Sequence, residues 1–243
     1  MLRLAITFAL WIVVGCGRSV ELPEEVYLCD HTTSAHCDEQ SVRREARAFL
    51  KAPLPGSRFT VLSVACTSDQ VETLYEIFVP TWGGGVARKR RAWLEAEEEH
   101  LESLHLRRQE RCSGIIGSIW RASRLLQESK RPTKVLIINS DLREVSAELG
   151  CNFEKAIPSP DVFLARIKEK NLLPDLRGVT VILYGVHDEV SPDSRRWTSQ
   201  QAAALRAAWA EAFRAMGVTG VEFRNAAPWE SPESGNVTLG GPR

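Results

Sequence analysis

The residues that decide the fold are VLII at positions 135–138, which Asn139-Ser140-Asp141 follow directly. Four consecutive apolar residues without alternation are typical of a central parallel strand that is buried on both faces. A second run of this kind, VTVILY, lies at positions 179–184. Around these two runs, segments with helical spacing of apolar residues alternate with segments of strand character. This alternation predicts a doubly wound α/β fold, in which helices cover both faces of a mostly parallel sheet.

Outward from the central strand, the same patterns predict the remaining elements. Further strands are expected at 26–29, 59–65, 71–79 and 218–223, of which 71–79 is an edge strand. Helices are expected around 42–50, 87–109, 113–126, 160–173 and 200–216. In such a sheet, ligands bind at the carboxyl ends of the strands, where the strand order reverses. The residues that leave the first and the central strand are therefore the first candidates for a site.

Composition excludes several classes of protein. The 243 residues are 44% hydrophobic and 26% charged, which suits one packed domain and a short leader. The 31 basic and 31 acidic residues balance, whereas nucleic-acid binding usually needs a basic excess, so no nucleic-acid partner is expected. A basic run at 88–91 and an acidic run at 97–99 lie in the long expected helix, and both are interpreted as solvated helix faces.

The first sixteen residues have the pattern of an export signal. Arg3 precedes an apolar stretch of eleven residues, Leu4 to Val14. This stretch is too short to cross a hydrocarbon core of roughly 30 Å, but it suits a signal peptide. Its end, Val13-Val14-Gly15-Cys16, resembles the lipobox of bacterial lipoproteins. The resemblance implies cleavage before Cys16 and acylation of its thiol, and two or three acyl chains give a stable membrane anchor.

We therefore expect a lipid-anchored protein of the bacterial cell envelope that faces the periplasm or the exterior. The expected organisation is a signal peptide at 1–15, a lipidated N-terminus and tether at 16–23, one domain at 24–225, and a flexible tail at 226–243. Five cysteines remain after Cys16, so at least one is free or pairs between chains, and their pairing stays open. Cys29 lies in an apolar run and is expected to be a small buried apolar residue.

Oxygen-bearing side chains gather where three expected elements begin or end. Asp30, Thr32 and Ser34 follow the first strand in the pattern Asp-x-Thr-x-Ser, Ser113 opens a helix, and Asp141 follows the central strand. Carboxylate and hydroxyl oxygens are hard ligands, which suit Mg²⁺ first and Mn²⁺ or Ca²⁺ as alternatives. An Asp followed by Thr and Ser is also ordinary turn and helix-cap chemistry, which is the competing interpretation of the first motif.

In order and in context, these residues resemble the metal-ion-dependent adhesion site of the von Willebrand factor A family. That site combines Asp-x-Ser-x-Ser after the first strand, a Thr before a later helix, and an Asp after the fourth strand. The resemblance implies a metal site of Asp30, Thr32, Ser34, Ser113 and Asp141. It also implies binding of a protein partner, whose acidic side chain fills an open position on the ion. Thr32 and Ser113 depart from the family residues but keep the hydroxyl.

Two alternatives to a binding module stay open. The first is a metal-dependent phosphatase or hydrolase with Asp30 as nucleophile or ligand. Thr32 stands where the haloacid-dehalogenase pattern has a second Asp, and Lys134 lies on the wrong side of its strand, so no enzyme is expected. The second alternative is a structural lipoprotein with a degenerate site that binds no metal.

We predict that the substitution Cys16→Ser blocks lipidation and leaves the precursor uncut at this position, because the thiol is the acyl acceptor. Labelling of cells with a fatty-acid analogue measures this directly. Equal label on the wild type and the variant would rule out the lipid anchor at Cys16.

Overall fold

The computed structural model describes residues 22–32, 35, 37–106, 112–184, 198–218, 220–223 and 237–238. Its strands are β1 (Pro23–Cys29), β2 (Arg58–Ser63), β3 (Thr73–Phe78), β4 (Thr133–Asn139), β5 (Val145–Ser146), β6 (Cys151–Asn152), β7 (Val179–Tyr184), β8 (Val221–Phe223) and β9 (Val237–Thr238). Its helices are α1 (Glu39–Lys51), α2 (Val86–Glu102), α3 (Ile115–Glu128), α4 (Pro160–Glu169) and α5 (Ser199–Ala215), with a 3-10 turn at Ser68–Gln70. Within this part of the chain, no helix is both long and apolar enough to span a membrane.

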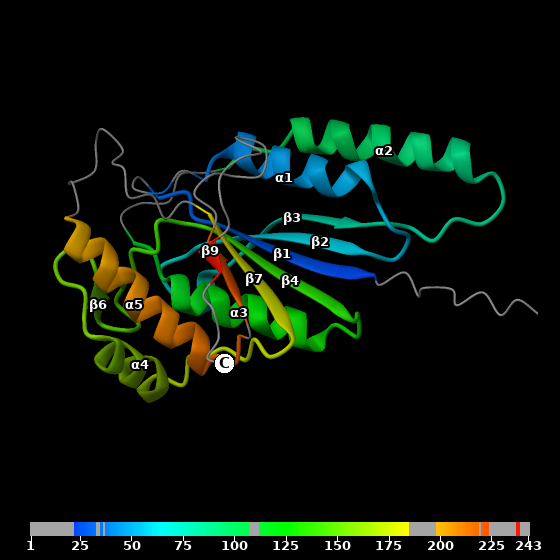
Figure 1. The fold of residues 1–243 in the computed structure, drawn as a ribbon. Helices are drawn as coiled ribbons and strands as arrows, with labels where there is room; N and C mark the ends of the chain where they lie inside the picture. The colour runs from blue at the N-terminus through cyan, green and yellow to red at the C-terminus, as the bar shows by residue number, and fades with distance from the viewer. Residues whose placement is uncertain are drawn as a thin grey trace, which may run out of the picture.

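The main sheet has seven strands in the order β3-β2-β1-β4-β7-β8-β9 (Figure 1). The five inner strands are parallel to one another, and β3 and β9 pair antiparallel at the two edges. From β1 the chain moves to β2 on one side, whereas β4, β7 and β8 follow one another on the other side. The strand order therefore reverses between β1 and β4, and the expected doubly wound α/β class is confirmed.

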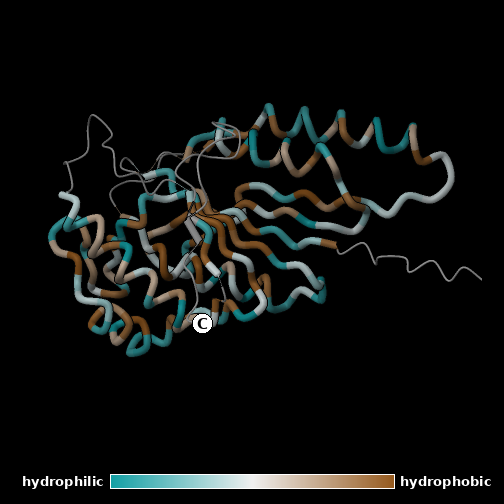
Figure 2. The backbone as a smooth tube through the Cα atoms, viewed as in Figure 1, coloured by the Kyte–Doolittle hydropathy of each residue, from teal (hydrophilic) through white to brown (hydrophobic). Residues whose placement is uncertain are grey.

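Helices cover both faces of the sheet, with α1 and α2 on one face and α3, α4 and α5 on the other (Figure 1). Leu28 is in register with Leu62 and Ile138, and these side chains pack in the larger core against α3 and α5. Tyr27 and Ile137, one residue earlier on their strands, pack in a second core beneath α1. The inner strands are consequently apolar on both faces towards their carboxyl ends, where Figure 2 shows them in brown.

Local capping explains where the helices begin. Asp38 precedes α1 and accepts a hydrogen bond from the Ser41 amide at 2.7 Å. Thr198 and Gln201 form a reciprocal capping box at the start of α5. These contacts satisfy backbone N–H groups that the first helical turn leaves without a partner.

Several boundaries differ from the sequence-based expectations. α2 ends at Glu102, and residues 103–106 are not helical, although a helix to residue 109 was expected. The short strands β5 and β6 were not expected, because two-residue strands leave no periodic signal. A tail expected to be flexible from residue 226 onward contributes β9, which pairs with β8 through Phe223 and Val237. The edge position of β3 is confirmed.

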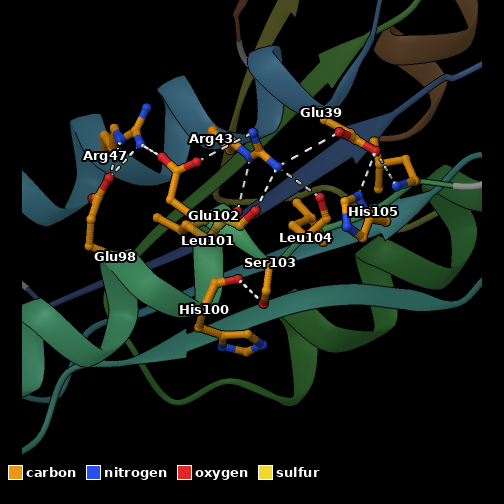
Figure 3. Close-up of polar contacts among 11 residues, drawn as sticks. Glu39, Arg43, Arg47, Glu98, His100, Leu101, Glu102, Ser103, Leu104 and His105 are labelled. Atoms are coloured by element: carbon orange, nitrogen blue, oxygen red, sulfur yellow. Dashed lines mark hydrogen bonds and ion pairs between the residues drawn. The ribbon is translucent and has the colours of Figure 1, made fainter.

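The helix α2 is attached to the domain by polar contacts with α1 (Figure 3) and by the apolar side chains of Trp93, Leu94 and Leu101, which pack on the second core. Leu101 is its only buried residue. The Arg43 guanidinium donates to the carbonyl oxygens of Leu101, Glu102 and Leu104 at 2.9–3.0 Å. These carbonyls belong to the last turn of α2 and to the residues just after it, where helical partners are missing. Arg43 is thus a side-chain cap for the end of α2.

A second set of contacts continues along the two helices. Arg47, one turn further along α1, forms ion pairs with Glu98 and Glu102. Tyr75 on β3 donates to the Glu97 carboxylate at 2.8 Å. The acidic half of α2 is therefore the half that holds the helix to the domain.

We predict that Arg43→Met loosens α2 while the sheet stays intact, because three carbonyls lose a charged donor, each hydrogen bond contributing about 1.5–3 kcal/mol. Hydrogen exchange over residues 93–106 should accelerate, with no change in β1 or β4. Arg121→Met, on the exposed surface of α3, is the matched control. Unchanged exchange in the Arg43 variant would show that the cap does not hold the helix.

Candidate functional site

The centre of the site is the fully buried carboxylate of Asp30 at the carboxyl end of β1. Three hydroxyls donate to it: Thr32 to Oδ1 at 2.8 Å, Ser113 to Oδ2 at 2.8 Å and Ser140 to Oδ2 at 2.6 Å. The Thr32 amide adds a longer bond of 3.3 Å to Oδ1. A buried carboxylate needs such donors because its desolvation is unfavourable. Ser113 and Ser140 thereby reach the Asp30 carboxylate although they lie 83 and 110 positions away from it along the chain.

The sheet places these residues because strand order reverses at this point. Beyond the last paired residues of the strands, the Asp30 amide donates to the Asn139 carbonyl at 3.0 Å. The Ser140 amide in turn donates to the Tyr184 carbonyl at 3.1 Å. The ladders of β1 and β4 thus continue into both loops, so Asp30 and Ser140 occupy fixed neighbouring positions. In α/β sheets, ligands bind beside the point where the strand order reverses.

Ser113 reaches the site through contacts with two other loops. Its amide and carbonyl pair with Val145 at 3.0 and 2.9 Å, in an antiparallel bridge. The next residue, Gly114, donates its amide to the Ala65 carbonyl at 2.8 Å. A Cβ at Gly114 would lie 2.7 Å from that oxygen and 2.8 Å from the Cys66 carbonyl oxygen. Only glycine allows this close approach, so the start of α3 is seated directly against the loop after β2.

Two disulfides flank the site. Cys29 pairs with Cys37 and closes the loop that carries Asp30 and Thr32. Cys66 pairs with Cys112, the residue directly before Ser113. Cys29 is buried, as expected, but it forms a disulfide and is not simply a small apolar residue. Cys151 is buried and free, so the expectation of at least one unpaired cysteine is confirmed within the described residues.

Asp141 also lies at this edge of the sheet, one residue after Ser140. Its Oδ1 accepts a hydrogen bond from the Arg143 amide at 3.0 Å, and its Oδ2 lies 3.3 Å from the Arg143 guanidinium. The intervening Leu142 has a left-handed backbone with φ of 60°, and Trp209 on α5 donates to its carbonyl at 2.9 Å. A non-glycine residue in this conformation is strained, and such strain is common near functional sites. The predicted role of Asp141 as a metal ligand stays a prediction.

A second buried carboxyl group, that of Glu144, lies beside the start of α3. Its Oε2 accepts from the Ile116 amide at 3.0 Å, whereas Oε1 is buried and has no hydrogen-bond partner among the described residues. Burial raises the pKa of Glu144 to about 8, against the lowering effect of the amides of Ile116 and Ile115. The nearby charge of Asp30 contributes to this rise in the pKa of Glu144. At neutral pH Glu144 is therefore largely protonated.

The donor set around Asp30 fits a hard divalent ion in kind. One carboxylate and three hydroxyls converge, and all four groups offer oxygen atoms of the type that Mg²⁺ binds. Within the described ranges, no group of three or more His, Cys, Asp or Glu side chains is arranged to hold a metal. Hydroxyls thus outnumber acidic groups in this site, and neutral oxygens would supply most of the ligands.

The structure brings Thr32 and Ser113 to Asp30, as expected, and their hydroxyl oxygens lie 3.5 Å apart. Ser34 and Cys16 lie outside the described residues. Ser140 and Glu144 were not anticipated. Ser140 was not predicted because the next residue, Asp141, is the more common type of metal ligand and was assigned to that position. The two disulfides had a signal in the sequence: Cys29 and Cys112 each directly precede a candidate site residue.

No protein-family model matches the chain, and no curated protein matches it. Among solved structures, it is similar in fold to an aerotolerance-related membrane protein of Bacteroides fragilis at 12% identity, with a TM-score of 0.40, covering 85% of this chain and 92% of that one. A minor pilin, PilB of Streptococcus sanguinis, shows 8% identity and a TM-score of 0.44, covering 85% and 57%. A von Willebrand factor type A protein of Catenulispora acidiphila shows 15% identity and a TM-score of 0.36, and the match covers 81% of this chain and 42% of that one.

We predict that Glu144→Gln makes stability less dependent on pH. The raised pKa means that the folded wild type binds more protons than the unfolded chain between pH 4.5 and about 8. Its stability therefore falls with rising pH in this window, by up to roughly 1.4 kcal/mol per unit. In urea unfolding with chelator, the free energy of unfolding of the variant should equal that of the wild type near pH 4 and exceed it at pH 8. Glu154→Gln, at an exposed position, is the control, and parallel curves for Glu144→Gln would contradict the assignment.

Proposed function

We propose that this chain is a lipid-anchored envelope protein whose domain, similar to von Willebrand factor A domains, binds a protein partner at the Asp30 site. The convergence of Thr32, Ser113 and Ser140 on one buried carboxylate carries the proposal. The reversal of strand order between β1 and β4 supports it, because binding crevices form there. Two disulfides beside the site support export to an oxidising compartment.

A divalent ion, Mg²⁺ first and Mn²⁺ or Ca²⁺ as alternatives, is part of the proposal. Asp30, Thr32 and Ser113 would hold it, with Ser34 and Asp141 as further ligands from the same loops. Bound there, the ion would supply a positive centre that attracts an acidic side chain of the partner. A partner that presents an acidic residue therefore suits this surface.

A second candidate is a site that needs no metal. Asp30 already accepts four hydrogen bonds, and three of them come from hydroxyls at 2.6–2.8 Å. Such a carboxylate has its hydrogen-bond partners without a metal, and it holds together the three loops that carry Thr32, Ser113 and Ser140. We call this arrangement the metal-free lock. The same engagement argues against Asp30 as a nucleophile, because its oxygens are directed at donors within the protein. We therefore propose binding rather than catalysis.

We predict that Asp30→Ala abolishes Mg²⁺ and Mn²⁺ binding in titration calorimetry, because the variant lacks the charged ligand. Ser113→Ala should weaken binding less, since a neutral oxygen contributes less than a carboxylate. Asp161→Ala, at an exposed position on α4, is the matched control and should bind as the wild type does.

Partner capture completes this test. Crosslinking from envelopes, with and without chelator, should recover a protein with the wild type and with Asp161→Ala, but not with Asp30→Ala. If the wild type shows no heat with either metal and chelator leaves capture unchanged, the metal-free lock is the correct function. If Asp30→Ala binds metal with wild-type affinity, the ion does not bind at Asp30.

A further inference from the structure

The first half of α2 carries a basic run that the domain does not neutralise. Arg88, Lys89, Arg90 and Arg91 are all exposed, and none of them forms an ion pair with a described residue. The second half of the helix differs, because its acidic side chains pair with Arg43 and Arg47 of α1. Packing against α1 therefore accounts for the acidic half of the helix and leaves the basic half unexplained.

The position of these charges is unfavourable for the helix itself. The N-terminus of a helix has a partial positive charge, and basic side chains there reduce its stability. The first turn of α2 contains no acidic residue, and its N-cap, Gly85, provides no side-chain hydrogen bond. An anionic surface against this end would relieve the repulsion that the helix alone leaves in place.

The basic half of α2 also extends beyond the rest of its layer. Arg47 lies opposite Glu98, and α1 continues only one turn further, to Lys51. On the corresponding side of Glu98, α2 continues for roughly three turns, so it overhangs α1 by about 10 Å. Figure 1 shows the start of α2 projecting past α1, on the side where β1 begins.

An exposed apolar side chain accompanies the basic run. Of the three large apolar residues that are exposed in the described part of the chain, two are Phe78 and Val86, at 49% and 47%. Phe78 is in register with Arg58, which is in register with Glu24 near the start of β1. The Phe78 side chain lies on the other face of the sheet from α2, because its neighbour Ile77 packs in the core beneath α1 and the Arg131 guanidinium lies over the Phe78 ring. We call Val86 and the four residues 88–91 the basic tip. The basic tip therefore lies at the edge of the sheet where the chain enters the domain, opposite Asp30.

We propose that the basic tip rests on the anionic lipid headgroups of the membrane that holds the Cys16 anchor. This inference rests on the lipid anchor of the proposed function. The seven residues from Gly17 to Pro23 span at most about 25 Å, so the anchor keeps this edge close to the membrane. Basic side chains near an anionic surface are attracted to it, and an exposed apolar side chain such as that of Val86 suits the headgroup boundary. The Asp30 site, at the far edge, then faces away from the membrane towards its partner.

The test uses the full chain purified from membranes and reconstituted into vesicles of phosphatidylcholine alone or mixed equally with phosphatidylglycerol. Hydrogen exchange over residues 83–92 should be about fivefold slower in the anionic vesicles, because contact with the headgroups protects the tip. Raised salt should remove the difference. Arg88→Glu/Lys89→Glu/Arg91→Glu should lose the slowing. Lys155→Glu/Lys168→Glu/Lys170→Glu, an equal charge change on exposed residues around α4, should retain it.

The outcomes separate this inference from the anchor. The mass of the Cys16 peptide reports acylation independently of exchange. Equal exchange in both vesicle types with Cys16 acylated overturns the contact and leaves the anchor in place. An unmodified Cys16 overturns the anchor, while the exchange still decides whether the tip meets anionic lipid. If added duplex DNA slowed hydrogen exchange over residues 83–92 and phosphatidylglycerol did not, the basic tip would bind nucleic acid and the proposal would be overturned.

Discussion

The structure at the carboxyl edge of the sheet depends on one buried charge, the carboxylate of Asp30. A carboxylate without solvent is unfavourable unless donors surround it, and here the donors come from the loops after β1, before α3 and after β4. These loops must therefore close together on Asp30. The close approach at Gly114 and the left-handed backbone at Leu142 are the conformations by which two of them reach it.

The fold class follows from the sequence because the inner strands are buried on both faces, and continuous runs such as VLII at 135–138 announce this. Thr32 and Ser113 were also predictable, because each stands where the adhesion-site pattern that the sequence resembles has a hydroxyl residue. The role of Ser140 was not predictable, because it depends on where the β4 ladder ends. The strand β9 was not predictable, because its pairing with β8 depends on a contact between separate segments that no local pattern encodes.

Acidic and basic side chains are separated along the helix α2. In α2 the acidic half binds the arginines of α1, whereas the basic half faces solvent beyond the end of that helix. A zero net charge therefore hides two regions of opposite character. Because the sheet is parallel, its two edges differ as well: one carries the site loops, and the other carries the entry of the chain. Composition alone could not reveal this polarity, since it averages over both halves of α2.

The two disulfides imply an order of events in the formation of the site. Cys29–Cys37 and Cys66–Cys112 each begin or end one residue from a group of the hydroxyl cluster. Such bonds do not persist in a reducing cytosol, but they form in the oxidising compartment beyond the membrane. A newly made precursor would thus hold these loops by hydrogen bonds alone. For the exported protein that we propose, covalent closure would follow translocation, so the loops around Asp30 would become fixed only in the compartment where the partner is bound.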